Sequence, residues 1–144
     1  MLKGHCLCGG VRYEISGELG PVTYCHCSQC RRASGSAFGS NASAHADEVT
    51  FVAGRELIRE FESSPGKFRA FCSHCGSPLY ARRNAKPQTL RMRLGTLEGG
   101  EGLQTHGHIW VSSKAAWYCI DDGLAQCPEM ADDAILFKDG PDRP

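Results

Sequence analysis

The chain has 144 residues, with 16 basic and 16 acidic side chains, so its formal net charge is zero. A neutral chain has no overall field to attract nucleic acid or an acidic membrane surface, and we expect neither partner. No apolar run approaches the ~20 residues that span a bilayer, and the first residues lack the apolar stretch of a secretory signal, so we expect a cytoplasmic protein.

The sequence contains nine cysteines. In a reducing compartment thiols are more often metal ligands or catalytic groups than disulfide partners, and an odd number fits a disulfide framework poorly. A secreted, disulfide-bonded domain is the alternative. Most of the thiols fall into three tight groups, which are Cys6 with Cys8, then Cys25 with Cys27 and Cys30, and finally Cys72 with Cys75.

Short segments with strand character follow one another along the chain, separated by turns of Gly, Pro and Ser. Residues 11–15 alternate apolar and polar side chains, as a half-buried strand does, and residues 22–24 form a short strand before the central thiol group. Ser28 is expected to cap a short helix that runs to Ala33 and ends near Gly35. Further strands are expected over residues 49–52, 56–61, 67–71, 78–81, 90–94, 109–111 and 117–120.

Two turns order the middle of the chain. Residues 63–66 predict a hairpin, and Cys72 and Cys75 occupy the turn that follows the next strand. In the segment 90–94 the apolar side chains share one face, which places Arg91 and Arg93 on what looks like an outer, solvated face. Many short strands with little helical periodicity predict a small, all-β single domain of antiparallel strands over residues 1–144.

The first and last thiol pairs have the spacing of zinc ligands. Cys72-x-x-Cys75-Gly76 has the form of a zinc knuckle, and Cys6-x-Cys8 is a tighter version. A structural zinc ion takes four ligands in a tetrahedron, and such pairs commonly supply them. We expect a closed four-cysteine site. The alternative is a redox Cys-x-x-Cys motif at 72 and 75, which needs a strand–helix context, whereas the flanking sequence is strand-like on both sides.

The central group offers only three thiols. A zinc ion with three protein ligands keeps a fourth position for a ligand. Three thiolates leave one negative charge on a divalent ion, which suits it to an incoming thiol rather than to hydroxide chemistry. The alternative is a second structural site completed by a distant residue. The candidates are His26, His45, His106, His108, Cys119 and Cys127. His26 is disfavoured because the middle residue of an extended Cys-x-Cys points away from its neighbours.

These motifs resemble those of the glutathione-dependent formaldehyde-activating enzyme family over roughly residues 4–128, with a C-terminal tail beyond. The likeness rests on residues 4–9 with 11–13, residues 25–35, residues 71–77, and residues 108–114 with Trp117. It implies a zinc-bound β-tent fold with two zinc ions. By position it assigns the structural site to Cys6, Cys8, Cys72 and Cys75, and the catalytic site to Cys25, Cys27 and Cys30.

The resemblance also implies a carbon–sulfur lyase type of reaction, in which glutathione and formaldehyde, a small thiol and a small electrophile, give S-(hydroxymethyl)glutathione. A non-catalytic glutathione- or thiol-binding carrier and a zinc-scaffolded protein-interaction module are the alternatives. Because glutathione carries two carboxylates, we expect cations at its site. Arg31, Arg32 and Lys114 are the candidates, against the alternative that each is a solvated surface charge. Core positions are expected for Phe38, Phe71, Trp110 and Trp117.

Overall fold

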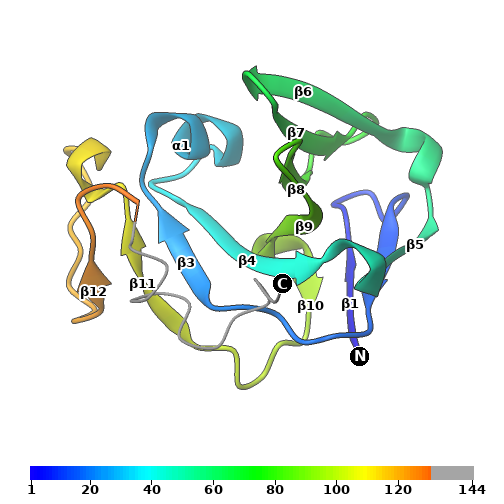
Figure 1. Cartoon of the computed structure of the whole chain (residues 1–144), viewed down its shortest axis with the longest axis horizontal. Coiled ribbons are helices and arrows are strands. Elements are labelled where there is room, and N and C mark those ends of the chain that lie inside the picture. Colours follow the sequence, from blue (N-terminus) through cyan, green and yellow to red (C-terminus); the bar gives the residue numbers. More distant parts are fainter. Residues whose placement is uncertain (131–144) are drawn as a thin grey trace.

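The computed structural model describes residues 1–130, which form a large sheet and a smaller one (Figure 1). The large sheet has the strand order β12-β11-β3-β4-β9-β8-β7-β6, and the small sheet has the order β10-β1-β2-β5. Neighbouring strands are antiparallel, except that β11 runs parallel to both β3 and β12. The expected all-β, largely antiparallel fold class is confirmed.

The strands are short and each is bounded by a turn or a single helical turn. The small sheet contains β1 (Leu2–His5), β2 (Arg12–Ile15), β5 (Val49–Ala53) and β10 (Leu97–Glu98). The large sheet contains β3 (Val22–Cys25), β4 (Gly39–His45), β6 (Ile58–Ser64), β7 (Lys67–Cys72), β8 (Pro78–Arg83), β9 (Lys86–Arg93), β11 (Thr105–Ile109) and β12 (Ala125–Gln126). The helical segments are α1 (Ser28–Ser34) and the 3₁₀ turns η1 (Ala46–Glu48), η2 (Arg55–Leu57), η3 (Leu94–Thr96) and η4 (Val111–Ser113).

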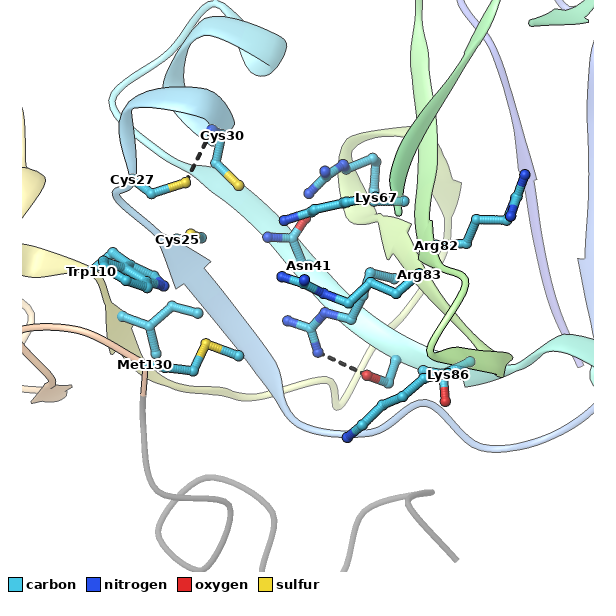
Figure 2. Close-up of a pocket in the computed structure, with 16 residues that line it drawn as sticks. Cys25, Cys27, Cys30, Asn41, Lys67, Arg82, Arg83, Lys86, Trp110 and Met130 are labelled. Carbon is cyan, nitrogen blue, oxygen red and sulfur yellow. Dashed lines mark hydrogen bonds between the residues drawn. The ribbon is translucent and has the colours of Figure 1, made fainter. Parts of the chain in front are cut away.

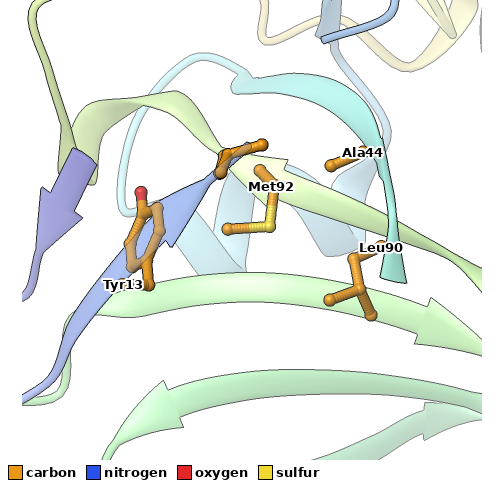
Figure 3. Packing of buried hydrophobic residues seen from close by; sticks show 5 residues of the cluster. Tyr13, Ala44, Leu90 and Met92 are labelled. Atoms are coloured by element: carbon orange, nitrogen blue, oxygen red, sulfur yellow. The ribbon is translucent and has the colours of Figure 1, made fainter. Parts of the chain in front are cut away.

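The two sheets pack against each other through one apolar cluster. Tyr13 and Ile15 of β2 meet Ala44 of β4 and Leu90 and Met92 of β9, all of them buried (Figure 3). Burying side chains of this size stabilises the fold by about 1.5–3 kcal/mol each. The cluster therefore fixes β4 and β9, which also carry residues of the pocket described below.

A glycine allows this packing. A Cβ atom on Gly4 of β1 would lie 2.2 Å from Cζ of Tyr13, so only glycine lets the Tyr13 ring cross the neighbouring strand. The Tyr13 hydroxyl forms a hydrogen bond of 2.9 Å with Oγ1 of Thr96. The small sheet is thereby tied to the turn that follows β9.

Most of the predicted strands are present with bounds shifted by a residue or two, and the hairpin at residues 63–66 joins β6 to β7. The sequence did not predict β1, β4, β10 or β12. β4 is made of small and polar residues of low intrinsic strand preference, and it forms a strand because β3 and β9 enclose it on both edges. The tail expected beyond residue 130 lies outside the described residues.

Four strand predictions differ from the structure, two at one end and two over most of their length. The segment 56–61 begins as the 3₁₀ turn η2, and the segment 90–94 ends at Arg93, because Leu94 starts η3. The segment 109–111 is broken because Trp110 has a left-handed backbone with φ of 58°. The segment 117–120 is a turn, since the Lys114 ammonium donates hydrogen bonds to the carbonyls of Ala115 and Tyr118.

Among residues 1–130 no helix is long and apolar enough to cross a membrane.

Candidate metal centres and ligand pocket

The first and last thiol pairs meet in space. The Sγ atoms of Cys6, Cys8, Cys72 and Cys75 all lie within 4.8 Å of one another. The Cys6–Cys8 and Cys8–Cys72 sulfur distances are 3.4 and 3.9 Å, near the ~3.8 Å edge of a tetrahedron with Zn–S bonds of ~2.3 Å. These separations are far longer than the ~2.05 Å of a disulfide. The group has the donor set and the size to hold a metal ion.

Tight turns shape each half of this four-cysteine group. The Gly9 N–H donates to the Cys6 carbonyl, and the Gly76 N–H donates to the Cys72 carbonyl, with both glycines at positive φ. The N–H of Val11 points at the Cys6 sulfur, 3.2 Å away, as expected for a thiolate that ligates a metal.

The central thiols also converge, at the point where β3 ends and α1 begins. The Sγ atoms of Cys25, Cys27 and Cys30 lie within 4.8 Å of one another, and Cys25 and Cys30 are buried. Cys25 is the last residue of β3 and is paired with Gly39 of β4 and Ile109 of β11, so two neighbouring strands hold it in place. This group too could hold a metal ion.

The helix cap differs from the prediction. Cys27, not Ser28, is the N-cap of α1, and its Sγ accepts a hydrogen bond of 3.3 Å from the Cys30 backbone N–H. Gly35 ends the helix in a left-handed conformation, as expected. One cysteine therefore serves both as a cap and as a candidate ligand, and that capping places Cys30 in the first turn.

No other Cys, His, Asp or Glu side chain in the described part of the chain joins the three thiols closely enough to share an ion with them. Cys127 packs against the group without completing it. His26 turns away from the thiols into the protein, where its Nε2 hydrogen bonds to Nδ1 of His108 at 2.7 Å. The Nε2 of His108 in turn bonds to Asp122 at 2.8 Å.

This His26–His108–Asp122 hydrogen-bond chain supports the backbone of the thiol group on the side away from the thiols. His26 and His108 are fully buried, and they link β3 to β11 and to the loop that carries Asp122. Burial lowers the pKa of His26, and the neighbouring His108 lowers it further. The two rings hold the backbone next to the thiol group without contributing a ligand.

The three thiols open into a pocket of about 430 Å³ (Figure 2). Lys67 and Asn41 point toward the thiol end, and Trp110 and Met130 form an apolar wall beside it. No acidic side chain of the described residues lines the pocket. Its cationic lining consists of Lys67, Arg82, Arg83, Lys86, Arg91 and Arg93.

The cations expected from the sequence are not those found at the pocket. Arg31 and Arg32 lie in the last turn of α1, where their positive charges interact favourably with the helix dipole. The Lys114 ammonium donates hydrogen bonds to the carbonyls of Ala115 and Tyr118. None of the three lines the pocket within the described residues. Arg91 and Arg93 do line it, so the expectation that they face solvent was wrong.

Sequence reasoning misplaced these arginines because alternation on a strand identifies two faces without saying what covers each. Leu90 and Met92 face the small sheet, and the opposite face of β9, which carries Arg91 and Arg93, is the floor of the pocket. Arg91 is held there by hydrogen bonds from its guanidinium to Ser43 at 2.8 Å and Thr23 at 2.9 Å.

The expected core aromatics differ in a similar way. Trp110 is half-buried at the pocket, and Phe38 stacks on Tyr24 with ring centroids 4.3 Å apart. Phe71 is also half-buried. Trp117 is 74% exposed, so its predicted core position was wrong. It follows the turn held by Lys114, which carries the side chain outward.

The electrostatics single out Cys30 within the group of three thiols. Contacts with Cys25 and Cys27 lower the pKa of the Cys30 thiol, and Arg93 and Arg69 lower it further. The same thiol contacts raise the pKa of Cys25. These contacts favour ionisation at Cys30 over ionisation at Cys25.

Comparison with known proteins gives the same assignment as the motifs. The family model described as glutathione-dependent formaldehyde-activating enzyme matches residues 1–113. A crystal structure of a Rhodobacter sphaeroides protein is similar, with a TM-score of 0.60 and 26% sequence identity over 74% of this chain and 98% of that one. The match covers both candidate metal groups. The chain belongs to the glutathione-dependent formaldehyde-activating enzyme family.

Proposed function

We propose that the protein binds zinc at both cysteine groups and uses the three-cysteine group to bind glutathione, or a related thiol, for addition to formaldehyde. The product is S-(hydroxymethyl)glutathione, and the reaction is of the carbon–sulfur lyase type. The observation that carries the proposal is the opening of three convergent thiols into a pocket lined with cations. A thiol that bears carboxylates matches both ends of such a pocket.

The donor set fits zinc, which prefers thiolate ligands in tetrahedral arrangement. Zinc, when bound by Cys25, Cys27 and Cys30, supplies a centre that holds an incoming thiol as its thiolate. The protein's own residues orient the rest of that molecule. Lys67 and Arg83 offer the charge that carboxylates require, and arginine suits their planar geometry.

The reaction needs little further chemistry from the protein. The sulfur forms a bond to the formaldehyde carbon, the carbonyl electron pair moves to oxygen, and the proton that leaves the thiol ends on that oxygen. Holding the thiol and the aldehyde together supplies much of the acceleration by proximity. A cavity of about 430 Å³ falls in the ordinary range for small-molecule sites.

A non-catalytic carrier is the second candidate. In the described residues the pocket lining has no Asp, Glu or His side chain that could act as a general acid or base. This observation is the reason to keep simple thiol binding as the second candidate.

Exchange spectroscopy by NMR separates the two functions. With zinc-loaded protein we expect faster exchange between the adduct and free formaldehyde plus glutathione than without it. Cys27→Ser, which removes one thiol of the group, should abolish the acceleration. Cys119→Ser is the matched control, because Cys119 is an exposed thiol that belongs to neither group.

If glutathione binds but the exchange rate does not change, the carrier function is the one that remains. If the protein neither binds glutathione nor accelerates the exchange, both forms of the proposed function are contradicted.

A further inference from the structure

Two buried guanidinium groups flank the three thiols from the side of the large sheet. Nη1 of Arg69, from β7, lies 3.7 Å from the Sγ of Cys30. Arg93, from β9, lies near the same cysteine. A Cβ atom placed on Gly39 would lie 3.4 Å from Nη1 of Arg93 and 3.5 Å from Cβ of Cys30, so Gly39 lies between the two side chains. Each arginine is only 8% exposed.

Neither arginine has a carboxylate partner among residues 1–130. The other hydrogen bonds of Arg69 go to neutral groups, the Ser63 hydroxyl at 3.0 Å and the Gln29 side-chain carbonyl at 3.3 Å. A buried cation without a counter-charge is strongly disfavoured. Sulfur can supply the counter-charge here, since the Sγ of Cys30 lies 3.7 Å from Nη1 of Arg69 and would be a thiolate when it ligates a metal ion.

The charges do not balance with three thiolates alone. Three thiolates on a divalent ion leave one negative charge, and two guanidiniums beside them turn this into a surplus of one positive charge. A fourth, anionic ligand on the ion would offset this positive charge, to which Lys67 at the thiol end of the pocket adds. A neutral ligand, such as water or imidazole, would leave a cation buried without a partner.

We propose that Arg69 and Arg93 are positioning residues that select an anionic fourth ligand, a thiolate, at the three-cysteine metal site through their charge. The inference rests on the proposed function, because it requires a metal ion at Cys25, Cys27 and Cys30. It adds a charge selection that acts at the sulfur atom itself, apart from the recognition of carboxylates farther along the pocket.

Cobalt(II) in place of zinc gives a direct test, because its absorption in the visible and near-ultraviolet reports the sulfur ligands. The cobalt-loaded full chain is titrated with 2-mercaptoethanol, a thiol without carboxylates, and separately with imidazole, a neutral ligand. The proteins compared are the wild type, Arg69→Gln, Arg93→Gln, Arg69→Lys and Arg93→Lys. Arg59→Gln is the matched control, since the hydrogen bonds of Arg59 go to the nearby carbonyls of Glu56 and Ile58, away from the thiols.

We expect each Gln variant to bind 2-mercaptoethanol about tenfold or more weakly than the wild type, while imidazole binding changes by less than about threefold. The Lys variants keep the charge and should retain most of the thiolate affinity. The control should behave as the wild type does.

The outcomes separate the two levels of the proposal. The charge selection is overturned if the Gln variants bind two cobalt ions and take up 2-mercaptoethanol like the wild type. It is also overturned if they lose 2-mercaptoethanol and imidazole binding equally. Both results leave the proposed function standing. If the Gln variants do not fold, the Lys variants decide, because loss of thiolate binding in a folded Lys variant also overturns it. A wild-type chain that binds no cobalt at the three thiols would overturn the proposed function itself.

Discussion

Asn41 is a pocket residue with an unused acceptor. It is buried on β4, its amide N–H donates to the Gly39 carbonyl at 2.9 Å, and its Oδ1 has no hydrogen-bond partner among the described residues. A buried unsatisfied acceptor costs about 1–3 kcal/mol. The acceptor is therefore suited to a donor on the ligand, such as an amide N–H or the ammonium of glutathione.

Replacement of Asn41 tests this role. We expect Asn41→Ala to weaken glutathione binding by about 5- to 30-fold, corresponding to a lost hydrogen bond of roughly 1–2 kcal/mol. Binding of ethanethiol, which has no hydroxyl, amide or ammonium donor, should be unchanged, and both affinities can be measured by calorimetry. Equal weakening of the two thiols would contradict the assignment.

At this scale the sequence predicts the metal ligands well and the ligand-binding side chains poorly. Cysteine spacing is a local property, so the grouping of Cys25, Cys27 and Cys30 can be read directly. The roles of Arg69, Arg93 and Asn41 depend on which strands lie side by side in the large sheet, and nothing in their local sequence distinguishes them from solvated residues.

Among the elements, the four-cysteine group acts as a clasp between the turn after β1 and the turn after β7. Cys8 and Cys72 are 64 residues apart in the sequence, yet their sulfur atoms lie 3.9 Å apart. Linking positions so distant restricts the unfolded chain by an amount comparable to a disulfide, about 4 kcal/mol. With a metal ion bound, we therefore expect the four-cysteine group to stabilise the fold and the three-cysteine group to carry the proposed chemistry.

Urea unfolding distinguishes the two groups. We expect Cys72→Ser to lower the free energy of unfolding by about 3–5 kcal/mol, and a strong chelator to do the same to the wild type. Cys27→Ser should cost less, because its group lies within one strand end and one helix turn. Exposed Cys119 again supplies the control, and a Cys72→Ser protein as stable as Cys119→Ser would contradict the clasp.

Strand prediction succeeded where side chains alternate and failed where neighbours decide. β7 and β8 carry a period of two and were predicted, whereas β4 is a strand only because its neighbours enclose it. The break at Trp110 was missed because a left-handed backbone at a tryptophan has no sequence signal.

The whole molecule places the three thiols and the cations of the pocket on one sheet. The thiols stand at the junction of β3 and α1, and the cations of β7, β8 and β9 lie across the pocket from them (Figure 2). The fold class was predictable from composition and turns. The strand order β11-β3-β4-β9, with its parallel step, was not, because it joins segments far apart in the sequence.

The most direct test of the account follows each metal site separately by ¹¹³Cd NMR of the cadmium-loaded protein, since the chemical shift of cadmium reports its number of sulfur ligands. We expect two resonances. One, from Cys6, Cys8, Cys72 and Cys75, should have the shift of four sulfur ligands and ignore glutathione. The other, from Cys25, Cys27 and Cys30, should move to that region when glutathione is added. A second resonance that does not move, or that has four sulfur ligands from the start, would contradict an open thiol-binding site.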